Sequence, residues 1–198
     1  MAKLYFKFGA MGGGKTLDCI RTFYNYKERN LIAKVYKSAL DTRSLEICSR
    51  TGDSMPCEVI TETHSIEELF KDITSKNTDV IIIDEAHWLT TKQVNDLKDF
   101  AIDFDIPIIC YGLLTDFKSY LFEGSKRLIE LADRKEEIKS ICWCGKLATQ
   151  NARVTEIEVD GVKKRKVIKE GEQYLVGGNE LYIPLCYLHF RNSDLGNL

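Results

Sequence analysis

Residues 9–16 read Gly9-Ala10-Met11-Gly12-Gly13-Gly14-Lys15-Thr16 and match G-x-x-x-x-G-K-[ST], the pattern of nucleotide-binding P-loops. The apolar segment 4–8 runs into this stretch, and a run with helical character over 15–29 leaves it. In such a strand–loop–helix unit, glycines let backbone N–H groups turn toward a phosphate, and the helix N-terminus adds its dipole. Lys15 supplies a cation, and Thr16 offers a hydroxyl to Mg²⁺. The stretch therefore predicts a phosphate site, with a glycine-rich turn between core elements as the alternative.

Strand and helix signals alternate along the chain until the neighbourhood of residue 135. We expect helices over 65–75, 90–104 and 124–133, and strands over 31–36, 57–60, 79–84 and 106–110. Strands that alternate with helices predict βαβ units and therefore a parallel sheet. The fold class that follows is an α/β P-loop (RecA-like) domain whose parallel sheet is flanked by helices.

The pattern changes near Glu136, where short β-like runs and Gly/Asn turns replace the alternation. Asp160-Gly161 lies between two such runs, 154–159 and 162–168, and is a hairpin signal. We therefore expect a second, smaller β lobe after the α/β part. The expected domains are a nucleotide-binding domain over 1–138 and a C-terminal lobe over 139–198.

Composition excludes several classes of protein. The chain has 198 residues with 28 basic and 30 acidic side chains, whereas a general nucleic-acid binder carries a basic excess. No apolar stretch approaches the roughly 20 residues of a membrane helix, and the N-terminus does not resemble a signal peptide. Seven cysteines without a secretion signal argue against a disulfide framework. We expect a soluble cytoplasmic protein that binds neither nucleic acid nor membrane.

Asp84 and Glu85 follow directly on the continuous apolar run 80–83. In P-loop enzymes an acid at the end of such a strand lies beside the P-loop and holds Mg²⁺. We assign that role to Asp84, together with the Thr16 hydroxyl. A second carboxylate beside the phosphates can accept a proton from an attacking hydroxyl or water. The alternative is that both acids cap the strand in solvent, and the residues alone leave the acceptor of the phosphoryl group open.

Two short pairs near the C-terminus combine into a metal-ligand set: Cys142-Trp-Cys144 and Cys186-Tyr-Leu-His189. Three thiolates and one imidazole suit tetrahedral Zn²⁺, and four protein ligands leave no open position for catalysis. A structural zinc would stabilise a lobe too small to be held by burial alone. The C-x-C spacing is tighter than the usual C-x-x-C, and the alternative is a set of unrelated buried thiols with a surface histidine.

Taken together, these motifs resemble, in the same order, those of the type II thymidine kinases, the family with a zinc-bearing lobe and a lasso loop. The resemblance covers nearly the whole chain. The matching motifs are the P-loop with Met11, Asp41-Thr42-Arg43, Asp84-Glu85-Ala86-His87-Trp88, the segment 111–117 with Phe122, the lasso over 171–178 with Tyr182, and the four zinc ligands.

The resemblance implies an enzyme that transfers the γ-phosphate of ATP to the 5′-hydroxyl of thymidine, and of deoxyuridine, in pyrimidine salvage. Glu85 is then the general base, Arg43 lies near the transferred phosphoryl group with Lys15, and Asp41 orients that loop. ATP contacts are implied for residues 9–16 and for Asp84, Glu85, Ala86 and His87. The resemblance also implies a homotetramer and feedback inhibition by dTTP.

On the nucleoside side, the resemblance implies that the base lies in an apolar slot under a backbone lid. Leu113 and Phe117 line or stack on the base, and Trp88 packs beneath the pocket. Phe122 completes the pocket. Backbone groups of Gly177 and Gly178 read the pyrimidine edge, Tyr182 lies at the sugar, and Asn151 lies near the 5-methyl group.

Three positions depart from the family pattern. His87-Trp88 stands where the family has Gln-Phe, and His87 is expected to add pH dependence near neutrality. A polar Asn151 near the base bears on the preference for thymine over uracil. Two competing functions are kept as alternatives: a P-loop ATPase or switch whose zinc lobe binds a protein partner, and a DNA-processing ATPase with a zinc finger. The second requires a basic surface, which the net charge of -2 does not suggest.

Overall fold

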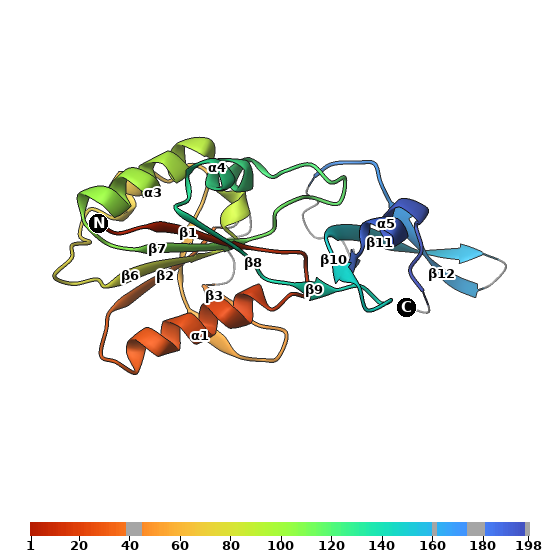
Figure 1. The fold of residues 1–198 in the computed structure, drawn as a ribbon, viewed down its shortest axis with the longest axis horizontal. Coiled ribbons are helices and arrows are strands. Elements are labelled where there is room, and N and C mark those ends of the chain that lie inside the picture. The colour runs from red at the N-terminus through yellow and green to blue at the C-terminus, as the bar shows by residue number, and fades with distance from the viewer. Residues whose placement is uncertain (39–44, 160–161, 174–180, 197–198) are drawn as a thin grey trace.

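The computed structural model of the chain describes residues 1–38, 45–159, 162–173 and 181–196. Two bodies lie side by side, a larger α/β part containing the N-terminus and a smaller β-rich lobe toward the C-terminus (Figure 1). Five positions named above lie outside the described residues: Asp41, Thr42, Arg43, Gly177 and Gly178. The Asp160-Gly161 turn lies outside them as well.

The larger part is built on a sheet with the strand order β5-β2-β6-β7-β1-β8. All neighbouring strands pair in parallel, so the predicted parallel sheet is confirmed. The carboxyl ends of parallel strands lie at one edge, which is where such sheets bind ligands. The strands are β1 Leu4–Phe8, β2 Ala33–Ser38, β5 Glu58–Ile60, β6 Val80–Asp84, β7 Ile108–Gly112 and β8 Arg134–Glu137.

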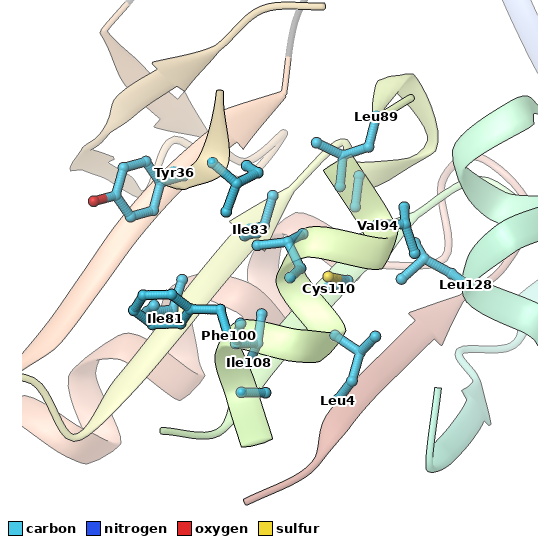
Figure 2. Close-up of a cluster of buried hydrophobic side chains, with 14 of the residues drawn as sticks. Leu4, Tyr36, Ile81, Ile83, Leu89, Val94, Phe100, Ile108, Cys110 and Leu128 are labelled. Carbon is cyan, nitrogen blue, oxygen red and sulfur yellow. The ribbon is translucent and has the colours of Figure 1, made fainter. Parts of the chain in front are cut away.

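Strand β6 is buried along its whole length, because helices cover both faces of the sheet (Figure 1). Side chains alternate between the two faces of a strand. Ile81 and Ile83 pack in one apolar cluster, and Val80 and Ile82 in another. Figure 2 shows the first cluster, where strand residues meet side chains from the helices over that face. An uninterrupted apolar run is therefore what this central position requires.

The helices are α1 Lys15–Lys27, α2 Ile66–Leu69, the 3₁₀ turn η1 Ala86–Trp88, α3 Thr91–Asp103 and α4 Glu123–Leu131. Helix α1 covers one face of the sheet, and α3 and α4 cover the other (Figure 1). Thr90 and Gln93 form a capping box that fixes the start of α3. The predicted alternation of strands and helices is therefore present, with boundaries displaced by a few residues.

The helix expected over 65–75 is only the single turn α2. Ser65 caps it, since its hydroxyl accepts the Glu68 N–H at 3.4 Å. Beyond Phe70, the side chain of Asn77 accepts the N–H of Thr74 and donates to the carbonyl of Asp72, both at 2.8 Å. Such local side-chain bonds satisfy backbone groups that a longer helix would use, and they favour a turn.

A small hairpin, β3 Glu46–Cys48 with β4 Ser54–Pro56, was not expected from the sequence. Ile47 and Met55 each point one apolar side chain into the cluster beside α1, where both are buried. Three-residue strands carry too little periodicity to be recognised. Their position is decided by these two contacts with residues distant in the chain.

The C-terminal lobe contains β9 Ser140–Ile141, β10 Leu147–Ala148, β11 Gln150–Val159, β12 Val162–Ile168, β13 Leu181–Leu185 and α5 Tyr187–Asn192. Strand β11 pairs antiparallel with both β12 and β13, so the predicted hairpin is present. The chain leaves β8 at Glu137 and enters the lobe at Ser140. The division at 138/139 into two domains stays a prediction. Within the described residues, no helix combines the length and apolar character needed to span a membrane.

Candidate active site and metal centre

The P-loop lies between the end of β1 and the start of α1, with Lys15 as the first residue of the helix. Gly14 has φ +83°, a conformation that side chains rarely adopt. The Lys15 ammonium group folds back over the loop and donates to the carbonyls of Gly9 at 3.1 Å and Ala10 at 2.8 Å. Burial lowers the pKa of Lys15, and the nearby carboxylates oppose that shift. The Lys15 cation is thus held against the P-loop, where it is expected to bind phosphate.

Asp84 ends β6 and meets the P-loop across the carboxyl edge of the sheet. Its carboxylate accepts a hydrogen bond from the Thr16 hydroxyl and another from the Glu85 N–H at 2.9 Å. Burial raises the pKa of Asp84, while these bonds and the charge of Lys15 act in the opposite direction. A carboxylate and a hydroxyl at this position are oxygen donors of the kind that Mg²⁺ prefers. The two residues assigned to Mg²⁺ therefore lie together and fit that ion.

Glu85 begins the turn η1 with φ +53°, which is rare for a residue other than glycine. Such backbone strain concentrates at functional sites. Burial and the negative charge of Asp84 raise the pKa of Glu85 to about 7, even though 42% of its side-chain surface is exposed. A carboxyl group that reaches solvent and titrates near neutrality suits a general base.

His87 lies behind Glu85 and is buried. Its Nδ1 accepts the N–H of Leu113 at 3.3 Å and lies 3.4 Å from Oε2 of Glu85. Aromatic rings surround it, with centroids 4.7 Å away for Trp88 and 4.6 Å away for Phe122. Burial lowers the pKa of His87 to about 3, so the imidazole is neutral at physiological pH. The expectation that His87 adds pH dependence near neutrality is wrong, because its surroundings exclude the charged form.

The aromatic residues predicted for the nucleoside side divide into two groups. Trp88 and Phe122 pack edge to face, with centroids 5.0 Å apart, next to His87 and close to the half-buried Leu113. Phe117 is buried elsewhere, with 1% of its surface exposed. Its contact with a base stays a prediction.

Arg153 was not predicted as a site residue, yet it lies at the centre of the second group. It is buried, and its guanidinium carbon lies 3.7 Å from the centroid of the Phe117 ring. It donates to the Tyr182 hydroxyl at 2.9 Å, and to the carbonyls of Glu172 at 2.9 Å and Gln173 at 3.2 Å. The signal in the sequence was weak: an arginine at an inward position of a strand, between Ala152 and Val154.

Two further side chains join the segment after β7 to residues 171–173. Lys118 donates to the carbonyl of Gly171 at 3.1 Å, and Gln173 donates to the Asp116 carboxylate at 3.0 Å. Asp116 is itself buried. The described part of the predicted lasso, residues 171–173, is therefore bound to the segment expected to hold the base.

Asn151 is buried, and both of its polar groups are used by backbone partners. Its Oδ1 accepts the N–H of Met11 at 2.8 Å, and its Nδ2 donates to the carbonyl of Thr115 at 2.8 Å. Its position near the 5-methyl group of a base stays a prediction. The link to the P-loop could not be anticipated, since the partners lie 140 positions apart.

Arg50 is a second cation close to the P-loop that sequence reasoning missed. It lies in the loop between β3 and β4, and its NH1 would lie 3.8 Å from a Cβ added at Gly12. Its charge contributes to the lowered pKa of Lys15. The sequence gives no recognisable signal for the hairpin that carries Arg50. The position of Arg50 close to the P-loop could therefore not be predicted either.

Cys142, Cys144, Cys186 and His189 lie together, with their ligand atoms within 4.8 Å of one another. Nδ1 of His189 lies 3.3 Å from the sulfur of Cys142 and 3.4 Å from that of Cys186, and the sulfurs of Cys144 and Cys186 are 4.0 Å apart. Ligands around tetrahedral Zn²⁺ are separated by about 3.5–3.8 Å, given bonds of about 2.0–2.3 Å. The cluster can therefore hold this ion.

The surroundings of the cluster orient its histidine. Trp143 stacks on His189 with centroids 4.3 Å apart, and Nε2 of His189 lies 3.9 Å from a carboxylate oxygen of Asp194. The indole of Trp143 donates to the Asp194 carbonyl at 3.2 Å. At zinc sites a carboxylate commonly faces the far nitrogen of a ligating histidine and fixes the orientation of the ring.

Comparisons with known proteins agree with this geometry. The sequence profile of the family described as Thymidine kinase matches residues 2–190. A protein named Thymidine kinase from Mannheimia succiniciproducens is 41% identical over 196 residues, which cover 98% of this chain and 97% of that protein. One from Zymomonas mobilis subsp. mobilis is 42% identical over 193 residues, 96% of each chain. One from Haemophilus influenzae is 38% identical over 196 residues, 98% of each chain.

Proposed function

The chain belongs to the thymidine kinase family, and we propose that its catalytic centre lies where the P-loop meets the Asp84–Glu85 turn. The reaction is transfer of the γ-phosphate of ATP to the 5′-hydroxyl of thymidine, with deoxyuridine as a second acceptor. The assignment rests on one observation. At one edge of the sheet, four residues of the expected types lie together: Lys15, Thr16, Asp84 and Glu85.

On the donor side, the P-loop amides and Lys15 bind the β- and γ-phosphates of ATP. Thr16 and Asp84 would hold Mg²⁺, which neutralises charge that develops on the phosphates during transfer. Arg43 approaches the transferred phosphoryl group and Asp41 orients its loop, as the family resemblance implies. Arg50 adds positive charge beside the loop. This side of the reaction is thus positioning and charge neutralisation, with little covalent chemistry.

On the acceptor side, Glu85 accepts the proton of the 5′-hydroxyl as the oxygen attacks phosphorus. Support comes from its half-exposed carboxyl group, its pKa of about 7 and its place beside the P-loop. The nucleoside lies over Leu113, Trp88 and Phe122, with Phe117 and Tyr182 completing the slot and Asn151 toward position 5 of the base. Gly177 and Gly178 read the pyrimidine edge through their backbone.

In the lobe, Cys142, Cys144, Cys186 and His189 hold a structural Zn²⁺. The ligand separations and the Asp194 carboxylate support this assignment. Four protein ligands leave no position open for substrate. A homotetramer in the cytoplasm, inhibited by dTTP, is carried over from the family and the sequence.

The test is a nucleoside panel with purified full-length chain, γ-labelled ATP and Mg²⁺. We expect label in dTMP when thymidine is present and little release of free phosphate without a nucleoside. Release of free phosphate that no nucleoside affects would indicate the hydrolytic switch instead. Hydrolysis stimulated by DNA and not by thymidine would indicate the DNA-processing ATPase.

A further inference from the structure

Met11, in the middle of the P-loop, has both of its backbone polar groups bound by side chains from the far end of the chain. Its N–H donates to Oδ1 of Asn151 at 2.8 Å, and its carbonyl accepts from the Ser140 hydroxyl at 3.0 Å. Asn151 and Ser140 are 3% and 5% exposed. The C-terminal lobe therefore holds this residue of the loop through two partly buried hydrogen bonds.

The backbone packs tightly at the same junction. A Cβ added at Gly9 would lie 2.1 Å from the carbonyl oxygen of Ile138, and one at Gly12 would lie 3.7 Å from Cγ of Pro184. The Ile138 N–H donates to the carbonyl of Phe8 at 2.7 Å, directly before the loop. Ile138, at the junction of the two parts, and Pro184, in the lobe, thus lie close to the P-loop in addition to the two hydrogen bonds.

The other end of the Asn151 carboxamide points to the acceptor side. Its Nδ2 donates to the carbonyl of Thr115 at 2.8 Å, in the segment between Leu113 and Phe117. One neutral side chain therefore spans from the donor loop to the segment expected to hold the base. The carboxamide brings no charge to the phosphate site, and both of its hydrogen-bonding ends are used.

A loop with glycine at four of its eight positions loses much conformational freedom when it is ordered around a phosphate. Contacts that order the loop beforehand reduce that loss and raise affinity. We propose that Asn151, supported by Ser140, is a positioning residue that pre-orders the P-loop and couples it to the nucleoside segment. This inference rests on the proposed function for its acceptor half, while its donor half requires only that the P-loop binds ATP.

If Asn151 pre-orders the P-loop, its removal changes the affinity for ATP as well as the affinity for the nucleoside. A residue that only touches the base would affect thymidine alone. A residue that connects the two sites makes the affinity of each ligand depend on the other, and the dependence is reciprocal. The two cases are separated by measuring ATP affinity in the absence of any nucleoside.

The experiment measures dissociation constants by calorimetry on the full-length protein, with the Mg²⁺ complex of AMP-PNP and with thymidine, separately and together. Asn151→Ala should weaken AMP-PNP binding about tenfold without thymidine, since the partly buried Met11 N–H loses its partner, and should weaken thymidine binding as well. Ser140→Ala should weaken AMP-PNP binding and leave thymidine binding near that of the wild type. In Asn151→Ala, the factor by which thymidine changes AMP-PNP affinity should approach one.

Gln150→Ala is the matched control, because Gln150 precedes Asn151 on β11 and bonds the exposed Ser119 without touching the P-loop. It should leave AMP-PNP affinity unchanged. AMP-PNP affinity at the wild-type level in both Asn151→Ala and Ser140→Ala would overturn the proposal, even if thymidine affinity falls. If Asn151→Ala does not fold, Ser140→Ala alone decides the donor half. A wild-type protein that binds AMP-PNP and fails to phosphorylate thymidine would reject the proposed function separately.

Discussion

The interior of the α/β part differs from that of the C-terminal lobe. The α/β part buries two apolar clusters on the two faces of its sheet. In the part of the lobe that the structure describes there is one cluster, and two of its buried members are the metal-ligand candidates Cys142 and Cys186. The α/β part, where we propose the phosphate chemistry, is stabilised by burial, whereas the lobe has four candidate metal ligands within reach of one another, and we propose that a bound metal stabilises it. The phosphate site and the C-terminal lobe can therefore be tested by separate substitutions.

The largest expected effect comes from removing the metal ligands. Cys142→Ser with Cys186→Ser should lower zinc from about one atom per chain to near zero and abolish thymidine phosphorylation, because metal binding and folding of such lobes are coupled. Metal analysis and near-UV circular dichroism are the measurements. Cys48→Ser with Cys57→Ser is the matched control and should keep its zinc. Loss of zinc in the control, with the first variant unaffected, would reject the ligand set.

The next largest effect is expected from a substitution that removes the general base and leaves the fold and the metal cluster intact. Glu85→Gln should lower kcat by about 10²–10⁴-fold, the usual contribution of a general base. AMP-PNP affinity, zinc content and melting temperature should stay near wild type. Glu67→Gln, at an exposed position on α2, controls for the loss of a surface charge. Turnover within twofold of wild type would reject the role of Glu85.

The pH dependence distinguishes Glu85 from its neighbour His87. A base must be deprotonated, so activity is present above the Glu85 pKa of about 7 and is lost as pH falls through it. We expect kcat/KM to decrease about tenfold for each pH unit below that value. Because His87 is neutral down to about pH 3, His87→Gln should keep this acidic limb. A limb that disappears in His87→Gln would assign the titration to the histidine.

The smallest effect concerns the interior of the lobe. Arg153→Leu removes the guanidinium from the Phe117 ring and leaves the carbonyls of Glu172 and Gln173 without their donor. We expect the free energy of unfolding to fall by about 2–3 kcal/mol and KM for thymidine to rise. Arg165→Leu, exposed on β12, should change stability by less than about 0.5 kcal/mol. Equal loss in both variants in urea titrations would contradict a special role for Arg153.

Several parts of the fold and the site could be predicted because they depend on neighbours in the chain. The P-loop pattern, the apolar run that precedes Asp84 and the alternation of strand and helix patterns are local signals. Where local hydrogen bonds compete, as around Asn77, the same reasoning predicted a helix that is too long. Arg50, Asn151 and Arg153 carried no comparable signal, because their partners are far away in sequence.

The sequence by itself determined the class of the sheet, the phosphate loop, the acids at the end of β6 and the composition of the metal cluster. Each of these follows from residue types at short, regular spacing. Only the tertiary structure decided that His87 is neutral, that Asn151 and Ser140 hold Met11, and that Arg153 stacks on Phe117. Burial and contacts between distant segments are properties of the folded chain, since they depend on which surfaces exclude water and which meet.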